Sequence, residues 1–135
     1  MDFNLNENQL MYVDTVRKFV KNEITPHILE MEKAHTFPWE IIGKAWEMGI
    51  INLCIPESVK GYEIDLISTA MIIEELSYGD SGISTSAMCN DLANVVIAQH
   101  GTEEQKERFL KPFVEKPLLA SFCLTERLIL PWSYT

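Results

Sequence analysis

Residues 81–100, SGISTSAMCNDLANVVIAQH, carry one formally charged side chain, that of Asp91. A helix with so little charge on any face is typical of one that neighbouring elements cover on all sides. We therefore expect this segment to form the central, surrounded helix of the fold. The segments before and after it are then expected to pack around it.

Two capping boxes mark the beginnings of other helices. In residues 6–9, NENQ, Asn6 can accept from the first turn while Gln9 reaches back, and residues 102–105, TEEQ, repeat the pattern. They predict a helix from residue 6 to about residue 22 and another from residue 102 to about residue 113. Pro26 and Pro38 suit the first turns of two short helices between them, which end near residues 34 and 49.

A fourth helix is expected between residues 65 and 79, before the charge-poor segment. Asp65 is suited to the N-cap, and one predicted buried face consists of Leu66, Ala70, Ile73 and Leu76. Residues 50–65, IINLCIPESVKGYEID, have turn residues and few helix signals, and they predict the longest loop. The pattern thus gives a mainly α fold, a six-helix orthogonal or up-and-down bundle.

The pattern changes after Pro117. Residues 118–125, LLASFCLT, form an apolar run that favours a strand buried on both sides, and residues 127–135 give a second candidate strand interrupted by Pro131. The sequence offers no other convincing strand to pair with them. We expect a helical domain over residues 1–117, and over 118–135 a short β segment followed by a divergent tail.

Composition excludes several functional classes. The 135 residues carry a net charge of -9 and a pI near 4.7, which argues against binding of nucleic acid. No apolar run is long enough to span a membrane and no signal peptide is evident, so a cytoplasmic location is expected. Cys54, Cys89 and Cys123 lack paired spacing, which predicts reduced, mostly buried thiols and no metal site.

Some conspicuous side chains have structural interpretations. The pairs at residues 74–75 and 103–104, each Glu-Glu, are expected on solvated faces or first turns rather than as acid and base. Trp39 and Trp46 lie seven positions apart and are expected to anchor the bundle from one helix face. His100, beside Gly101, is expected at a helix end.

Five segments in this order and spacing resemble the acyl-CoA dehydrogenase family. They are LNENQLMYVDTVRKFVKNEITPH (5–27), PWEIIGKAWEMGIINLCIPE (38–57), IIEELSYGDSGIST (72–85), HGTEEQKERFL (100–110) and ASFCLTE (120–126). Together they resemble the amino-terminal helical domain of the short- and medium-chain members, over about residues 3–126. The resemblance implies a flavoenzyme of fatty-acid or amino-acid catabolism.

In that family a carboxylate removes the α-proton of an acyl-CoA thioester, and a hydride passes from the β-carbon to FAD. The catalytic glutamate comes from the carboxy-terminal part, so no residue of this chain is assigned as catalytic. Electron-transfer flavoprotein is the family's redox partner. The resemblance also implies a mitochondrial matrix location if the organism is eukaryotic.

The resemblance assigns a small set of site residues. Phe122, Leu124 and Thr125 match positions that line the flavin ring. On the charge-poor helix, positions that line the acyl-chain cavity are matched by Ser84, Thr85, Met88 and Leu92. The alternative interpretation of these small side chains is that they let neighbouring helices approach.

Departures from the family pattern lead to further expectations. Relatives continue TE with Pro-Gly-Ala-Gly-Ser-Asp, whereas here Arg127 follows Glu126; in the loop, a Gly-Gly pair is replaced by Lys60-Gly61. We expect a polypeptide interrupted where the β-domain would begin, inactive alone. The alternatives are a non-catalytic helical interaction module, which forms homo-oligomers through its helices or its C-terminal strand, and a helical acyl-CoA carrier.

Overall fold

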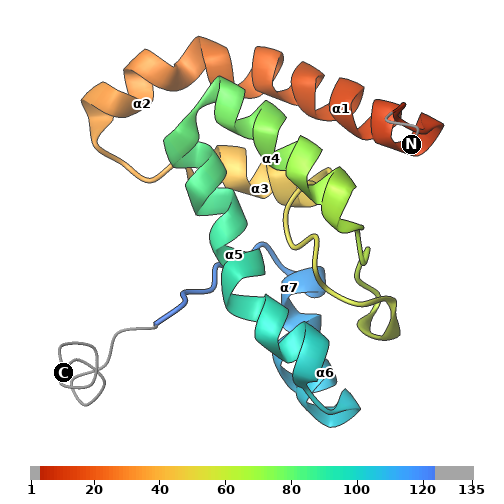
Figure 1. The fold of residues 1–135 in the computed structure, drawn as a ribbon. Helices are drawn as coiled ribbons and strands as arrows, with labels where there is room; N and C mark the ends of the chain where they lie inside the picture. The colour runs from red at the N-terminus through yellow and green to blue at the C-terminus, as the bar shows by residue number, and fades with distance from the viewer. Residues whose placement is uncertain (1–3, 124–135) are drawn as a thin grey trace, which may run out of the picture.

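The computed structural model describes residues 4–123, which fold into packed helices without a β-strand among them (Figure 1). The α-helices are α1 (Glu7–Phe19), α2 (Ile28–Ala34), α3 (Trp39–Glu47), α4 (Leu66–Gly79), α5 (Ser81–His100), α6 (Glu103–Phe109) and α7 (Lys111–Glu115). The mainly α class is thus confirmed.

The first two expected helices form one continuous helical segment. A π-helical turn, Val20–Ile24, and a 3-10 turn, Thr25–His27, connect α1 to α2. The backbone N–H of Thr25 donates to the carbonyl of Val20, five residues earlier, so the chain stays helical up to Pro26 by changing the type of turn. With α6 and α7 also adjoining, the described residues form five α-helical segments, beside a short 3-10 turn at Glu57–Val59, and the expectation of six separate helices is wrong.

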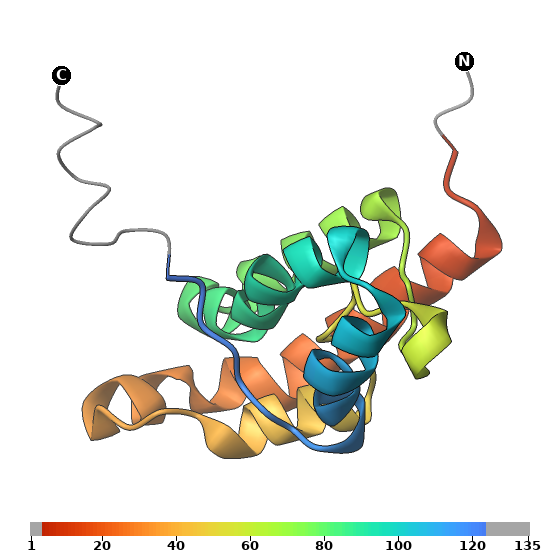
Figure 2. The same cartoon turned by 90° about the horizontal axis from the view of Figure 1, so that it is seen from below.

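The main core lies between α1, α3, α4 and α5. Helix α1 packs along α4, and α4 packs against α5 (Figures 1 and 2). Fully buried members of this cluster include Val16, Ile24, Leu53, Ile72 and Leu76. A smaller cluster of Ile55, Val59 and Leu110 joins the long loop to α6 and α7.

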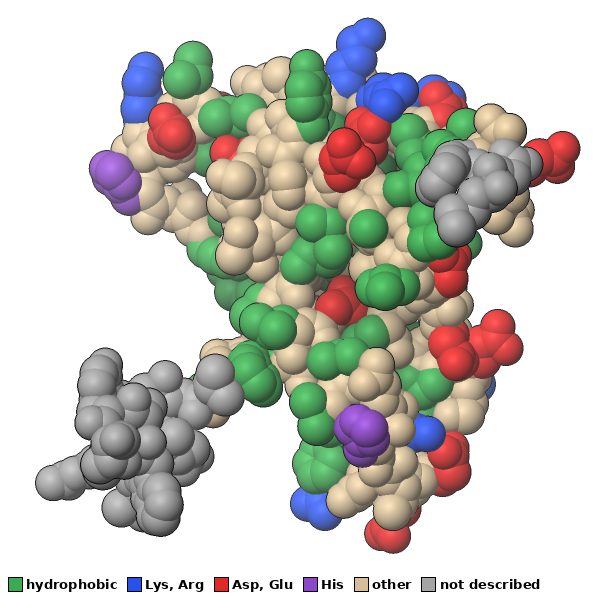
Figure 3. Space-filling model, in the orientation of Figure 1, with side chains coloured by type: hydrophobic (Ala, Val, Ile, Leu, Met, Phe, Trp, Pro, Cys, Tyr) green, Lys and Arg blue, Asp and Glu red, His purple; other side chains and the backbone are tan. Residues whose placement is uncertain are grey.

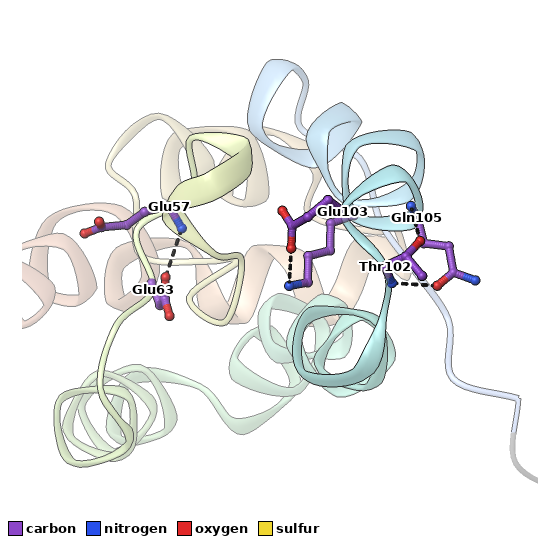
Figure 4. Close-up of polar contacts among 6 residues, drawn as sticks. Glu57, Glu63, Thr102, Glu103 and Gln105 are labelled. Atoms are coloured by element: carbon purple, nitrogen blue, oxygen red, sulfur yellow. Dashed lines mark hydrogen bonds and ion pairs between the residues drawn. The ribbon is translucent and has the colours of Figure 1, made fainter.

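The predicted caps are confirmed. In the first box the Gln9 backbone N–H donates to Asn6 Oδ1 at 2.9 Å, and Gln9 Oε1 accepts from the Asn6 N–H at 3.0 Å. Thr102 and Gln105 form the second box (Figure 4). Asp65 Oδ1 accepts from the first-turn amides of α4. These helix starts depend on local bonds, which explains why the sequence predicts them.

The predicted buried face of α4 is only partly confirmed: Leu76 is fully buried and Ile73 is half-buried, but the other two positions are not. Leu66 is 84% exposed and Ala70 is exposed, while the buried positions are Ser68, Ile72 and Leu76. Apolar residues occur all around the first half of this helix, so the pattern alone does not select the face that meets α1.

Helix α5 is central but not surrounded. Its inner face is buried at Ile83, Ala87 and Asn90, yet Leu92 is 58% and Val96 is 52% exposed. The low charge of this helix therefore does not mean that it is covered on all sides. One face is packed, and the other is open and carries apolar residues.

The strand expected from residue 118 is not found in its described part. Residues 118–123 have no strand partner, and a strand needs a neighbouring chain to bond its backbone. The rest of that strand, the second candidate strand and the tail lie outside the described residues.

Two side-chain expectations also need correction. Trp46 is partly buried in the core, but Trp39 is 61% exposed and contacts the ring of Phe37.

Cys54 and Cys89 are half-buried free thiols, and Cys123 is an exposed one, so burial of the thiols is only partial. His100 ends α5 as expected.

Candidate functional site

The open face of α5 is the main candidate surface. Thr85, Met88 and Leu92 lie at spacings of three and four residues, which place them on one side of the helix, and Val96 continues the row. Thr85 is exposed, and its hydroxyl donates to the Ser81 carbonyl at 2.8 Å. Figure 3 shows hydrophobic side chains gathered on the face that α4 and α5 present in this view.

Ser84 lies at the buried edge of that row. Its side chain is buried, and its Oγ accepts a hydrogen bond from Ser77 Oγ of α4 at 2.8 Å. Of the four predicted cavity residues, helical spacing places Thr85, Met88 and Leu92 on one side of α5, although Met88 is half-buried against the main core. Ser84 instead joins two helices.

Residues 117–123 run from α7 past α5 in both ribbon views (Figures 1 and 2). Side chains of α5 hold this segment: Cys89 Sγ lies 3.1 Å from the Ala120 carbonyl oxygen, and the Asn90 amide bonds to the backbone of Leu118 and Ala120. The segment that carries Phe122 is thus attached to the helix that carries the open face.

A buried polar network supports this attachment. Asn90 Nδ2 donates to Asn52 Oδ1 at 2.7 Å, and Asn52 Nδ2 donates to the Phe113 carbonyl at 3.1 Å. Trp46 Nε1 donates to the same carbonyl at 2.7 Å. The network links the long loop, α3, α5 and the middle of α7. Neither Asn52 nor Asn90 was identified from the sequence. For Asn90 a signal was available, because an asparagine in the middle of a charge-poor helix is too far from either end to act as a cap.

The predicted flavin-lining residues are only partly described. Phe122 is 42% exposed at the end of the attached segment, whereas Leu124 and Thr125 lie outside the described residues. An exposed aromatic side chain on a segment held against an open helix face fits one side of a flavin ring. Phe122 and the α5 face are therefore the described residues that could hold FAD and an acyl chain.

A hollow of about 480 Å³ lies between the long loop and α5, and its lining includes Cys54, Ile64, Leu66, Asp91 and Val95. Asp91 Oδ1 accepts from the Cys54 backbone N–H at 2.7 Å, which ties the loop to the helix. Burial, reinforced by the negative charge of Asp91, raises the pKa of the Cys54 thiol far above its usual range. The raised pKa favours the protonated form of this thiol at neutral pH.

The acidic pairs have the predicted surroundings at Glu74, Glu103 and Glu104, whereas Glu75 is half-buried rather than on a solvated face. Glu75 forms an ion pair with Arg17 on the surface between α1 and α4, and Glu74 is exposed. Glu103 lies in the first turn of α6 and pairs with Lys106 at 2.8 Å (Figure 4). Within residues 4–123, no three His, Cys, Asp or Glu side chains are grouped so as to hold a metal ion.

Comparison with known proteins agrees with this arrangement. Residues 6–116 match the acyl-CoA dehydrogenase N-terminal domain, and the chain belongs to the acyl-CoA dehydrogenase family. It is 36% identical over 126 residues to a probable medium-chain specific acyl-CoA dehydrogenase 2, mitochondrial, of Caenorhabditis briggsae, an alignment that covers 93% of this chain and 31% of the relative.

Solved structures share the fold. Butyryl-CoA dehydrogenase of Megasphaera elsdenii superimposes with a TM-score of 0.84 and 31% identity, over 94% of this chain and 34% of that one. A chain from the structural study of the electron transferring flavoprotein of Acidaminococcus fermentans gives a TM-score of 0.85 and 37% identity, with the same coverage. The chain thus spans about a third of the length of the relatives it matches.

Among the described residues, no helix is both long and apolar enough to cross a lipid bilayer.

Proposed function

We propose that this chain supplies the amino-terminal wall of an acyl-CoA dehydrogenase site. Thr85, Met88 and Leu92 of α5 face the acyl chain, and Phe122 stands beside the flavin ring together with Leu124 and Thr125. Ser84 supports the wall from its buried position against α4.

The observation that carries the proposal is the attachment of the Phe122 segment to α5. Asn90 and Cys89 bond to residues 118 and 120, so Phe122 follows within two residues of an attachment point on the helix whose outer face is open. Leu92 and Val96, both more than half exposed, give this face an apolar surface suited to a hydrocarbon chain.

In this proposal the residues of this chain bind the acyl thioester and orient it against the flavin. FAD, when bound, supplies an acceptor for the hydride from the β-carbon of the thioester. The α5 wall would exclude water from the acyl chain and align its α- and β-carbons with the flavin edge. The resemblance assigns the catalytic glutamate to the carboxy-terminal part of the family's proteins, so in this proposal proton removal needs a residue from elsewhere. Electron transferring flavoprotein is the proposed oxidant of the reduced flavin.

A chimera tests the proposal. Residues 1–123 of this chain would replace the matching part of the Megasphaera elsdenii butyryl-CoA dehydrogenase, whose fold they share. We expect a folded protein that copurifies with FAD and oxidises butyryl-CoA. The 135-residue chain alone is expected to retain no FAD, because it offers a single wall of the pocket.

The Leu92→Asp variant of the chimera gives the internal control. It places a charge on the open face, so we expect retained flavin absorption and a raised KM for butyryl-CoA. A chimera with a native-like circular dichroism spectrum and no bound flavin would overturn the proposal, as would a Leu92→Asp chimera with an unchanged KM.

A further inference from the structure

The side chain of Asn90 uses both donor hydrogens of its amide. It is completely buried on α5 and has three protein partners: Nδ2 donates to Asn52 Oδ1 at 2.7 Å and to the Leu118 carbonyl at 2.8 Å, and Oδ1 accepts from the Ala120 N–H at 2.6 Å. An asparagine amide has two donor hydrogens and a carbonyl acceptor, so this environment matches what the side chain offers.

Two of these partners lie two positions apart on one segment, the C=O of Leu118 and the N–H of Ala120. In a parallel sheet, one residue of a strand bonds to its neighbour with this spacing, through its own N–H and C=O. The Asn90 amide therefore occupies the place of a strand neighbour for the residues around Leu119. This explains how these two backbone groups find hydrogen-bond partners although no strand pairs with the segment among residues 4–123.

We propose that Asn90 is a positioning residue, which holds residues 118–120 against α5 and thereby sets where Phe122 stands. The inference rests on the proposed function, because Phe122 matters only if a flavin lies beside it. It adds a residue that acts through the backbone of the segment and does not touch the flavin or the substrate.

Asn52 makes this arrangement rigid. Its backbone has a positive φ of 61°, a conformation that asparagine tolerates better than most residues, and its amide connects Asn90 to the Phe113 carbonyl. The second hydrogen of Asn90 Nδ2 is thereby fixed on the loop, so the first hydrogen points to Leu118.

Asn94 shows that burial of an amide in α5 does not by itself create such a contact. It lies one turn further along the same helix and is also buried, but among residues 4–123 its Nδ2 has no hydrogen-bond partner. Asn94 is therefore a matched control: the same residue type, helix and burial, without attachment to the segment.

Backbone amide exchange of the full chain, followed by two-dimensional ¹⁵N NMR, tests the role of Asn90. In Asn90→Ala we expect the Ala120 amide to exchange roughly fivefold to tenfold faster, after correction for any change in global unfolding measured at core amides. In Asn94→Ala, the corrected exchange of Ala120 should stay at the wild-type rate.

The Asn90→Asp variant keeps the acceptor of this side chain and removes both of its donated bonds, to Asn52 and to Leu118. Its carboxylate still accepts from Ala120 but has no hydrogen for Leu118, so we expect protection of Ala120 to be retained while the carbonyl carbon shift of Leu118 moves. If Ala120 exchanges in the wild type at the rate of an unstructured peptide, or if Asn94→Ala releases it as much as Asn90→Ala does, the inference is wrong. The wild-type measurement can overturn the inference even if a variant fails to fold.

The amide-exchange experiment tests the role of Asn90, and the chimera tests the proposed function, so the two can fail separately. A chimera without flavin, together with release of Ala120 only in Asn90→Ala, would remove the proposed function and leave the attachment intact. A chimera with flavin and an Ala120 amide unaffected by Asn90→Ala would do the reverse.

Discussion

The inner and outer sides of α5 both carry apolar residues, but the inner ones are buried and the outer ones are exposed. On the inner side, packing against α4 and the loop buries Ile83 and Ala87; on the outer side, Leu92 and Val96 remain more than half exposed. Burial of apolar side chains stabilises a fold, whereas an exposed apolar face stabilises nothing until something covers it. The contrast teaches that apolar residues of one helix can stabilise the fold on one face and, on the other, remain open for the binding surface that we propose.

The largest expected effect comes from comparing Leu76 with Leu92. Leu76 of α4 is completely buried in the main core, so Leu76→Ala should lower the free energy of unfolding by about 2–5 kcal/mol through lost burial and a cavity. Leu92→Ala removes the same atoms from the open face and should change it by less than about 0.5 kcal/mol.

Urea unfolding followed by circular dichroism at 222 nm measures both variants. Similar losses for the two leucines would show that the outer face of α5 is covered in solution, for example by a second copy of the chain. In that case the midpoint of the Leu92→Ala variant should depend on protein concentration.

Much of the packed side could be predicted from the sequence. The boxes at Asn6 and Thr102 depend on bonds within three residues, and the six expected helices all exist as helical segments, although the first two are joined. What failed was the choice between faces. Leu66 and Ile72 are both apolar, and the packing of α4 against α1 and α5 leaves the first exposed and the second buried.

The open side was harder to predict because it depends on contacts between distant residues. The bonds from Asn90 reach Asn52 and Leu118, which are 38 and 28 positions away, and no local pattern specifies them. The family resemblance placed Thr85, Met88 and Leu92 on one helix, but it did not reveal that Ser84 turns towards α4. The positions of Phe122 beside a flavin and of the residues around it stay predictions.

An intermediate effect on the free energy of unfolding is expected from substitutions in the long loop, residues 50–65. The residue that replaces the first glycine of the relatives' Gly-Gly pair, Lys60, has a left-handed φ of 67°. Since this conformation costs a non-glycine residue about 1 kcal/mol, Lys60→Gly should raise the free energy of unfolding by about that amount.

The neighbouring Gly61 is the control for this loop. A Cβ on Gly61 would lie 2.1 Å from the Ile55 carbonyl oxygen, so the backbone must move and Gly61→Ala should be destabilising. Urea midpoints of the two single variants test the pair. A Lys60→Gly protein that is less stable than the wild type would show that the Lys60 side chain stabilises the loop by more than its backbone strain costs.

The smallest expected effect concerns the N-cap of α4, a helix with one buried and one exposed apolar face. Hydrogen bonds from Ser68, first from its hydroxyl and then from its backbone N–H, hold the pKa of the Asp65 carboxyl below its usual value. A group whose pKa is lower in the folded state contributes stability in full above its unfolded pKa, near 3.9, and loses it as the pH falls through the folded pKa. The loss at Asp65 should therefore occur below about pH 4.

Melting temperatures of the wild type and Asp65→Asn between pH 7 and pH 2.5 measure this contribution. Asparagine still caps the helix but does not titrate, so the wild type should be the more stable protein at pH 7 and the difference should shrink as the pH falls. Ser68→Ala removes the leading cause of the shift and should make the acid-induced loss begin at higher pH. A melting-temperature difference between wild type and Asp65→Asn that is constant across this range would contradict the prediction. Asp65 would then stabilise α4 only as a neutral acceptor does, and its charge would not contribute to the stability of the packed side.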